Sequence, residues 1–220
     1  MRQKRVVIIG AGAHGREVAE ILRQQAQQGE AVLPLGFVDD DRSLHGRVID
    51  QLPVLGDWTW FEGVDRSEIV VICASGFSAT RRQMVERARA RGLSFANAIF
   101  PMAYISPHAQ IGQGVVLCQH SSLCRGTLIG DHAIINVGAI VSHDTEVGPY
   151  ATLNPGVNLA GNVTIGEGCY LGIGCSVIQG ISIGAWTIVG AGAAVIRDLP
   201  AGVTAVGVPA KIIKPADQTE

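Results

Sequence analysis

His143 stands among polar residues that could do acid–base chemistry. Asp144 follows it directly, and Asn136 lies seven residues earlier. An imidazole held by a neighbouring carboxylate is a common general base near neutral pH, and an amide nearby can hold a polar group of the substrate. These three residues therefore predict removal of a proton from a nucleophile. The alternative is a solvated histidine on the protein surface.

The residues around His143 follow a six-residue period. From Ile105 to Val195 every sixth residue is aliphatic. An α-helix has 3.6 residues per turn and does not fit this period, whereas three hexads close one coil of a triangular parallel β-helix. Glycine recurs every eighteen residues, once per coil, at Gly112, Gly130, Gly148, Gly166 and Gly184. The sequence therefore predicts a β-helix in which residues eighteen apart are stacked ~4.8 Å apart.

This coil spacing predicts the neighbours of His143. Arg125 lies one coil before it and Gly161 one coil after it. A glycine beside the imidazole leaves space for a substrate and presents a bare backbone amide, which suits a carbonyl oxygen that gains negative charge in the transition state. By the same spacing, Asn136 is expected to stack on Asn154.

A glycine-rich turn lies near the start of the chain. Residues 6–9 have the pattern of a buried strand, residues 10–15 are Gly-Ala-Gly-Ala-His-Gly, and residues 16–25 have helical character. This order presents free backbone amides and a helix N-terminus to phosphate groups. The residues predicted to bind substrate here are Gly12, His14 and Gly15. The alternatives are a tight turn without a ligand and a histidine that only caps the helix.

Acidic residues follow the second predicted strand. This strand covers residues 35–38, and Asp39, Asp40 and Asp41 come directly after it. A Rossmann-type unit binds a ribose or base with an acid in this place. Residues 1–100 are few for a dinucleotide fold, so we predict an α/β, Rossmann-like unit that holds a mononucleotide through Asp39 and Asp40. A solvated acidic loop is the alternative.

Length and charge limit the possible classes of protein. The 220 residues are 47% apolar, which is enough for two modest cores, and we predict domains at residues 1–100 and 101–220. The net charge of −2, without a large basic cluster, argues against nucleic acid as a partner. The apolar run at residues 6–9 is too short for a signal peptide or a membrane span, which predicts a cytoplasmic protein without membrane insertion.

The cysteines and the other histidines indicate neither disulfides nor a metal. Five cysteines without a CxxC spacing fit packing better than pairing, with a nucleophile at Cys118 or Cys124 as the alternative. His108, His120 and His132 are twelve residues apart, or two faces of a coil, so they cannot converge on a metal within one chain. No metal is therefore expected, and a metal shared between subunits is the alternative.

Four features of the sequence together resemble the hexapeptide-repeat sugar O- and N-acyltransferases of the sialic-acid O-acetyltransferase group. They are the repeats, the turn at residues 10–15, the series Asn136…His143-Asp144…Leu-Ala-Gly-Asn (159–162), and the ending Gly-Val-Pro-Ala-Lys (207–211). The likeness covers nearly the whole chain and is greatest to bacterial enzymes that acetylate nucleotide-linked 4-amino-4,6-dideoxy sugars. It implies a left-handed β-helix, a homotrimer, acetyl-CoA bound along the β-helix, and a nucleotide held by the N-terminal domain.

The resemblance also implies roles for single residues. His143 resembles the family's general base, Asp144 the acid that orients it, and Asn136 a residue near the sugar amino group. Asp39 and Asp40 match contacts to the nucleotide base. The residues expected along acetyl-CoA are Thr152, Gly161, Gly190 and Lys211. The Gly161 amide is expected to meet the thioester carbonyl. A histidine often stands at the position of Thr152 in close relatives, so here a hydroxyl would have to donate the hydrogen bond.

The expected activity is acetyl-CoA-dependent N-acetylation of the 4-amino group of a UDP- or GDP-linked 4-amino-4,6-dideoxy sugar, in cell-surface glycan biosynthesis such as that of lipopolysaccharide O-antigen. The resemblance favours UDP, and two acids beside the base favour GDP, with dTDP also open. The first alternative is an O-acetyltransferase of sialic acid or a related sugar. The others are a nicotinamide oxidoreductase built on the glycine turn and a noncatalytic nucleotide-sugar scaffold.

Overall fold

The computed structural model describes residues 4–216, which form two compact units. The first unit contains the residues up to Gly76 together with Thr80–Pro101. The second contains Phe77–Ala79 and the residues from Met102 onward. None of the helices in the described part of the chain is long and apolar enough to cross a membrane.

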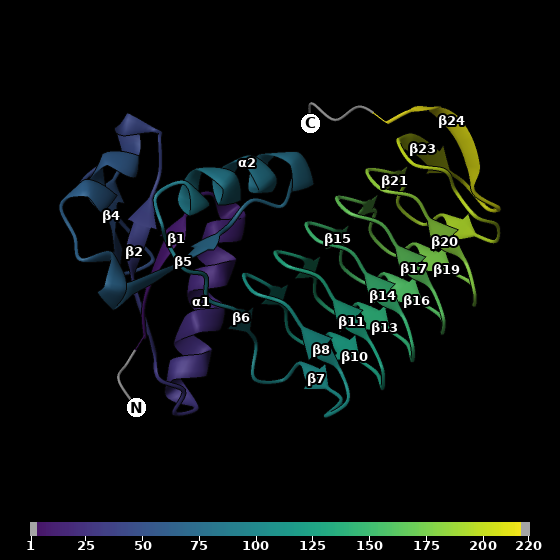
Figure 1. Ribbon diagram of the computed structural model, residues 1–220, viewed down its shortest axis with the longest axis horizontal. Helices are drawn as coiled ribbons and strands as arrows, with labels where there is room; N and C mark the ends of the chain where they lie inside the picture. Colours follow the sequence, from purple (N-terminus) through teal and green to yellow (C-terminus); the bar gives the residue numbers. More distant parts are fainter. Residues whose placement is uncertain (1–3, 217–220) are drawn as a thin grey trace. The chain divides into compact units, whose positions relative to one another are not determined.

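The first unit is a Rossmann-like α/β unit whose sheet has the strand order β3-β4-β2-β1-β5 (Figure 1). Strands β1, β2, β4 and β5 are parallel, and β3 is an antiparallel edge strand. The elements are β1 (Lys4–Ile9), α1 (Ala13–Gln27), β2 (Val32–Val38), β3 (Val48–Ile49), β4 (Leu52–Gly56), β5 (Ile69–Cys73), α2 (Ser78–Arg89) and β6 (Ala98–Ile99). Three short 3₁₀ helices cover Arg42–Leu44, Trp58–Glu62 and Arg66–Glu68.

The sheet is buried because its central strands are apolar on both faces. In β1 the four residues from Val6 to Ile9 are all buried, as is usual for a parallel sheet between other layers. Helix α1 packs its buried stripe, which includes Val18 and Leu22, near β1 and β2. Gln25 of the same stripe is buried too, and its amide oxygen accepts a hydrogen bond from the backbone of Ile99.

Three features of this unit differ from the sequence-based expectation. Helix α1 begins at Ala13 and not at Arg16, so part of the glycine turn forms the first helical turn. The second strand begins three residues earlier than predicted, at Val32, and includes Pro34. Proline is tolerated there because the pairing between β1 and β2 shifts register at this point. The hairpin of β3 and β4 had no strand signal that we recognised.

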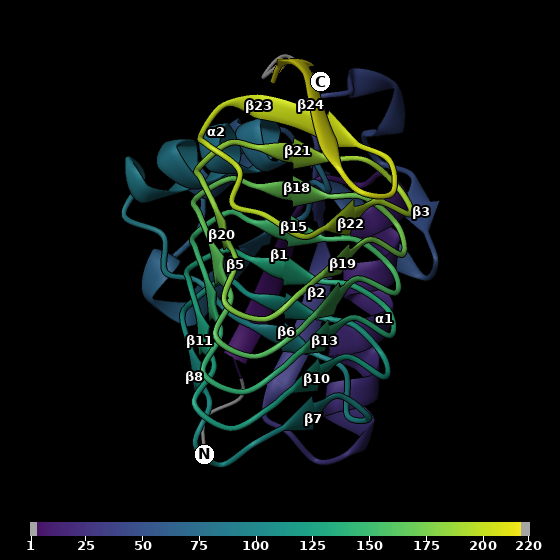
Figure 2. The ribbon, with the colours of Figure 1, turned by 90° about the vertical axis from the view of Figure 1, so that its right-hand side faces the viewer.

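The second unit is a left-handed parallel β-helix with three faces (Figures 1 and 2). The first face contains β7 (Tyr104–Ile105), β10 (Ser122–Leu123), β13 (Ile140–Val141), β16 (Asn158–Leu159), β19 (Ser176–Val177) and β22 (Ala194–Val195). The second contains β8 (Gln110–Ile111), β11 (Leu128–Ile129), β14 (Glu146–Val147), β17 (Thr164–Ile165) and β20 (Ser182–Ile183). The third contains β9 (Val116–Leu117), β12 (Ile134–Ile135), β15 (Thr152–Leu153), β18 (Tyr170–Leu171), β21 (Ile188–Val189), β23 (Val203–Val206) and β24 (Lys211–Pro215).

The predicted eighteen-residue coil is confirmed by the strand pairing. Ser122 pairs with Tyr104 on one side and with Ile140 on the other, and all three faces follow this register. The core is filled by the aliphatic residue that ends each strand and by the residue four places later. Cys169 and Cys175 are buried in this second position, and burial raises the pKa of these thiols to about 11 and about 12. They are therefore packing residues and not nucleophiles.

A residue with left-handed backbone conformation stands at each corner of the β-helix from Gly114 to Gly192. The third residue after each inward aliphatic has a positive φ without exception from Gly114 to Gly192. Most of these residues are glycine, which adopts this conformation without strain, and Asp144 and Asn162 are types that tolerate it. The backbone of Asp144 is thus set by the corner, with φ of 56°.

The coil glycines on the second face are required by close approach between coils. A Cβ added at Gly130 would lie 2.5 Å from the backbone nitrogen of Pro149. Gly130→Ala should therefore destabilise the protein by about 1–3 kcal/mol through overpacking, measured by thermal unfolding followed by circular dichroism. Gly138→Asn is the control, because Gly138 has open space and asparagine occupies the same corner position at Asn162. Equal melting temperatures for the two variants would contradict this account.

Candidate active site

His143 lies at the corner that follows β13, and Asp144 is its partner. The Nδ1 atom of His143 lies 3.0 Å from Oδ2 of Asp144. The two side chains are 55% and 61% exposed, so this pair is open to a ligand. A carboxylate on Nδ1 selects the tautomer in which Nε2 carries the lone pair. Within residues 4–216 no group contacts Nε2 by a hydrogen bond, so this nitrogen is available as a base.

Glycines border the pair on the neighbouring coils, as the coil spacing predicts for Gly161. A Cβ added at Gly161 would lie 2.5 Å from Nε2 of His143. One coil earlier, a Cβ at Gly126 would collide with the carboxylate of Asp144. Both side chains therefore rest on bare backbone, and the space beside the imidazole is bounded by Gly161.

The backbone around Gly161 leaves one donor available. The carbonyl oxygen of Gly161 accepts from the amide of Gly180, and the neighbouring amide of Asn162 donates to the carbonyl of His143. The amide of Gly161 itself has no acceptor in the described part of the chain. A backbone N–H next to a general base can hold an oxyanion, so this corner offers a base and an oxyanion donor together.

Asn136 and His143 stand at different corners of the β-helix. Asn136 follows β12, at the corner before β13, whereas His143 follows β13. Its Oδ1 atom accepts from the amide of Val137 at 2.7 Å. Its stacking on Asn154 is as predicted, since the Asn136 amide donates to the carbonyl of Leu153 in the same coil-to-coil register. A part for Asn136 in binding the sugar stays a prediction.

The three other residues predicted along acetyl-CoA lie on the third face. Thr152 is 2% exposed, and its hydroxyl lies 3.4 Å from that of Ser78. The amide of Gly190 donates to the carbonyl of Ala205, and its Cα faces Val206. Lys211 begins the exposed strand β24. Of these three, Lys211 is therefore the most accessible to a ligand, and Thr152 is the least.

The glycine turn of the first unit is held by the end of β2. The amide of Gly10 donates to the carbonyl of Val38, and the amide of Ala11 donates to Oδ2 of Asp39 at 2.7 Å. Two of the amides that the sequence suggested for phosphate binding are therefore occupied. Gly12 is the N-cap of α1 and is exposed, so the free donors are the amides of the first helical turn.

Gly15 and His14 have different surroundings in that helical turn. A Cβ at Gly15 would collide with the carbonyl of Gly10, so Gly15 is needed for close packing of the helix on the turn. Nδ1 of His14 lies 3.1 Å from Oε2 of Glu17. The hydrogen bond from His14 lowers the pKa of Glu17. Nε2 of His14 is buried without a hydrogen-bond partner among residues 4–216.

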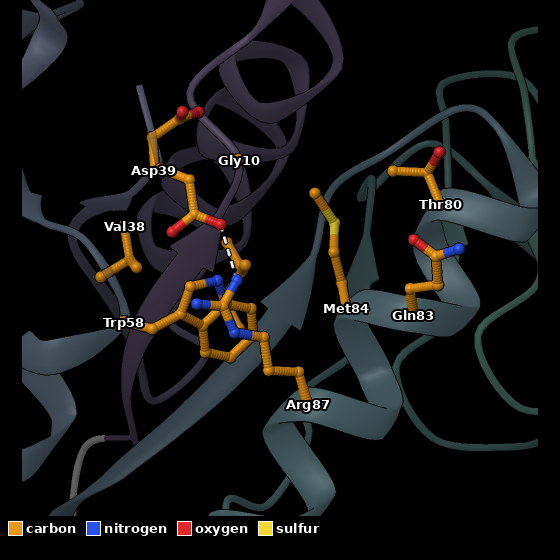
Figure 3. Close-up of a pocket in the computed structure, with 10 residues that line it drawn as sticks. Gly10, Val38, Asp39, Trp58, Thr80, Gln83, Met84 and Arg87 are labelled. Carbon is orange, nitrogen blue, oxygen red and sulfur yellow. Dashed lines mark hydrogen bonds and ion pairs between the residues drawn. The ribbon is translucent and has the colours of Figure 1, made fainter. Parts of the chain in front are cut away.

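A pocket of about 300 Å³ lies at the carboxyl ends of β1 and β2 (Figure 3). Asp39 and Asp40 line it, as expected for the nucleotide site of a Rossmann-like unit. Oδ1 of Asp39 accepts from the backbone of Asp41, while Oδ2 of Asp40 lies 2.6 Å from Nη1 of Arg87. The full lining is Ile9, Gly10, Val38, Asp39, Asp40, Trp58, Thr80, Gln83, Met84 and Arg87.

Trp58 and Arg87 are pocket residues that sequence reasoning missed. The guanidinium of Arg87 lies 4.5 Å from the centre of a Trp58 ring. Trp58 belongs to a short 3₁₀ helix and Arg87 to α2. No spacing pattern links residues that come from two separate elements of this kind.

The other candidate residues have ordinary structural surroundings. His132 is buried and stacks on Tyr150, with ring centres 5.4 Å apart. Cys118 is buried and Cys124 is half-buried, and neither forms a disulfide. Among residues 4–216 no group of three or more histidine, cysteine or acidic side chains is arranged to hold a metal ion.

Three features together define the class of hexapeptide-repeat acyltransferases. They are the β-helix of hexapeptide coils, the Rossmann-like unit and the histidine–carboxylate pair at a coil corner. Comparisons with known proteins narrow this class. A family model described as the PglD N-terminal domain matches residues 5–88. A GDP-perosamine N-acetyltransferase of Escherichia coli O157:H7 is 30% identical over 140 residues, which is 63% of this chain and 62% of the relative's length.

Two solved structures are similar over nearly the whole chain. A histidine-to-alanine mutant of GDP-perosamine N-acetyltransferase from Caulobacter crescentus, in complex with CoA and GDP-perosamine, is 42% identical, with a TM-score of 0.87, over 94% of this chain and 96% of that chain. The acetyltransferase domain of PglB from Neisseria gonorrhoeae FA1090, in complex with acetyl coenzyme A, is 33% identical, with a TM-score of 0.87, over 96% of this chain and 100% of that domain. The chain belongs to the hexapeptide-repeat sugar acyltransferase family, in the group of acetyl-CoA-dependent sugar N-acetyltransferases.

The contact between Gly161 and the imidazole can be tested by Gly161→Ala. The added Cβ would occupy the position beside Nε2, and His143 would have to swing away, which its exposed side chain can do at little cost in stability. We expect turnover of acetyl-CoA to fall by roughly 10- to 100-fold, since a shift of about 1 Å can have an effect of this size. Gly174→Asn is the control, because a Cβ at Gly174 has open space and asparagine holds the same positive φ at the equivalent corner position, Asn162. Unchanged turnover in Gly161→Ala, in a steady-state assay of thiol release, would refute the placement.

Proposed function

We propose that the chain transfers the acetyl group of acetyl-CoA to the 4-amino group of a nucleotide-linked 4-amino-4,6-dideoxy sugar. The observation that carries this proposal is the pair of His143 and Asp144. Nε2 of His143 faces the bare backbone of Gly161. The relatives whose names include GDP-perosamine N-acetyltransferase support an amino sugar as the acceptor. The mutant of the Caulobacter relative, in which a histidine is replaced, is bound to both CoA and GDP-perosamine.

In the proposed mechanism His143 is the general base. The neutral amine attacks the thioester carbonyl, a C–N bond forms, and the carbonyl oxygen becomes an oxyanion that the Gly161 amide holds. Nε2 of His143 takes a proton from the nitrogen of this adduct. The C–S bond then breaks, and the same proton neutralises the leaving thiolate. Asp144 fixes the imidazole tautomer and stabilises its positive charge.

We assign the two parts of the substrate complex to the two predicted domains. Residues 1–100 would hold the nucleotide sugar through Asp39, Asp40 and the turn that contains Gly12, His14 and Gly15. Residues 101–220 would carry out acyl transfer, with Asn136 near the sugar amino group. The acetyl-CoA contacts are assigned to Thr152, Gly161, Gly190 and Lys211. Support comes from the pocket beside Asp39 and Asp40 and from the exposed position of Lys211.

We further propose a homotrimer that acts in the cytoplasm on a precursor of cell-surface glycans such as lipopolysaccharide O-antigen. The first face of the β-helix supplies apolar surface for subunit contacts. Its exposed side chains include Tyr104, Ile140, Ile178 and Ile196. Apolar patches of this kind on a single chain commonly mark protein–protein contacts.

The acceptor can be tested directly with purified protein. We expect release of CoA thiol from acetyl-CoA in the presence of a UDP- or GDP-linked 4-amino-4,6-dideoxy sugar, with an N-acetyl product by mass spectrometry. The same sugar with a 4-hydroxyl is the matched control and should give no product. Product only from the hydroxyl sugar or from sialic acid would instead establish an O-acetyltransferase. A protein that binds a nicotinamide cofactor and not acetyl-CoA would overturn the assignment.

The base can be tested by His143→Ala. Because general base catalysis contributes about 10²–10⁴-fold, turnover at neutral pH should fall by at least 100-fold, with little change in the Michaelis constants. Asp144→Asn should lose less, because this acid acts only through the imidazole. His108→Ala removes another exposed histidine of the same unit and serves as the control. Full steady-state activity of His143→Ala would exclude His143 as the base.

A further inference from the structure

Two aromatic side chains of the second unit form a nearly parallel pair beside Asn154. The ring centres of Phe77 and Tyr170 are 6.5 Å apart, and the planes of the rings differ by 16°. The Tyr170 hydroxyl donates to Oδ1 of Asn154 at 3.3 Å. We propose that this aromatic pair contacts the C6 methyl of the acceptor and selects a 6-deoxy sugar over a 6-hydroxy sugar. This inference rests on the proposed function and assigns a selective contact to its acceptor.

The polar groups next to the aromatic pair are bonded to one another. Oδ1 of Asn154 accepts from Tyr170, and Nδ2 of Asn154 donates to the carbonyl of Leu171 at 2.7 Å. Ser78 follows Phe77 in the chain, and Thr152 pairs with Tyr170 in the strand register. The hydroxyls of Ser78 and Thr152 lie 3.4 Å from each other. The surface that the aromatic pair offers to a ligand is therefore apolar.

Phe77 is the more accessible member of the aromatic pair. It is 52% exposed, whereas Tyr170 is half-buried. An exposed ring gains free energy when an apolar group of a ligand covers it. Binding sites for small molecules commonly combine apolar and aromatic walls with a few polar groups that fix orientation. A methyl group of the acceptor is an apolar group of the right kind.

The place of the aromatic pair fits the part of the acceptor next to the reacting amine. Asn136 is assigned to the sugar amino group, and Asn154 stacks on Asn136 one coil later, ~4.8 Å away. In a pyranose ring C4, which carries the amine, is bonded to C5, and C5 carries C6. A sugar with its amine at Asn136 can therefore place its C6 methyl against the Tyr170 ring. The other neighbour of C4 carries a hydroxyl, which an apolar surface does not suit.

Phe77 also adjoins, along the chain, the pocket beside Asp39 and Asp40. Phe77 directly precedes α2, and Thr80 in the first turn of α2 lines the pocket. Figure 3 shows Thr80 on the side of the pocket away from Asp39. With the nucleotide base assigned to Asp39 and Asp40, the opposite end of the nucleotide, which carries the sugar, is directed toward the start of α2.

A 6-hydroxyl in this place would give up hydrogen bonds to water and gain none from the aromatic pair. The amide of Asn154 is engaged at both ends, so it has no group to spare for that hydroxyl. A polar group that is desolvated without a partner weakens binding, and this penalty produces selectivity. Apolar sites discriminate against one added hydroxyl by roughly 10- to 100-fold.

The selectivity can be measured as binding, without acetyl transfer. Isothermal titration of the whole chain compares a 4-amino-4,6-dideoxy sugar with the 4-amino-4-deoxy sugar that keeps its 6-hydroxyl, both linked to GDP in one series and to UDP in a second. We expect the 6-deoxy sugar to bind about 10- to 100-fold more tightly. Equal affinities would overturn the inference and leave the proposed function intact. Selective binding of the 6-deoxy sugar without its acetylation would contradict the proposed function alone.

Phe77→Leu separates contact with the sugar from packing at the start of α2. The variant loses the ring and keeps an apolar side chain. We expect the preference for the 6-deoxy sugar to fall by about tenfold, because the methyl loses its aromatic wall. A ring that only held the start of α2 would affect the melting temperature, measured by circular dichroism, and leave the ratio of the two affinities unchanged. That unchanged ratio would exclude Phe77 from the selective contact.

Tyr170→Phe gives a test by gained affinity. The ring stays, and Oδ1 of Asn154 is released from the Tyr170 hydroxyl to accept from a 6-hydroxyl. We expect the 6-hydroxy sugar to bind about 2- to 10-fold more tightly than to the unaltered protein, as one net hydrogen bond provides. Tyr150→Phe is the matched control, since Tyr150 is buried and stacks on His132. It should leave both affinities unchanged. A folded Tyr170→Phe variant with unaltered affinity for the 6-hydroxy sugar would refute the placement of C6.

Discussion

The backbone register between successive coils is the constraint on which the β-helix and its candidate site depend. Each coil contains eighteen residues, and its strands pair with the strands directly before and after it. This pairing places Gly161 beside the imidazole of His143 and Gly126 beside the carboxylate of Asp144. A single inserted residue would move every later side chain by one position, turning inward residues outward. The proposed base and the proposed oxyanion donor therefore have a common structural origin.

In the first unit a single carboxylate has a comparable role. Asp39 follows β2, and its two oxygens bind the amides of Ala11 in the glycine turn and of Asp41 in the next loop. One side chain thus joins the ends of β1 and β2, which form one side of the pocket beside Asp39 and Asp40. Because this clamp occupies both oxygens of Asp39, Asp40 is the neighbouring acid that keeps one oxygen without a hydrogen bond among residues 4–216.

The parts of the structure that arise from the six-residue sequence repeat could be predicted from the sequence, and the parts without a repeat could not. The hexads fixed the faces, the coil length and the stacking of Gly161 on His143, because each depends only on counting residues. The pocket contact between Trp58, Asp40 and Arg87 depends on how a 3₁₀ helix, a strand end and α2 come together. Gly15 matches a phosphate-binding motif, yet its surroundings show a packing role that spacing alone does not reveal.

Within residues 4–216, His14 and His143 each have a carboxylate next to Nδ1, and the exposure of the two side chains separates what each can do. The side chain of His14 is 14% exposed, and its Nε2 is buried, whereas the side chain of His143 is 55% exposed. His14 lies in the first turn of α1, where the helix N-terminus favours the negative charge of its partner Glu17. A base must gain and lose a proton in each turnover. The histidine whose Nε2 is open beside bare backbone is suited to that cycle, and the buried one is suited to holding the helix start in place.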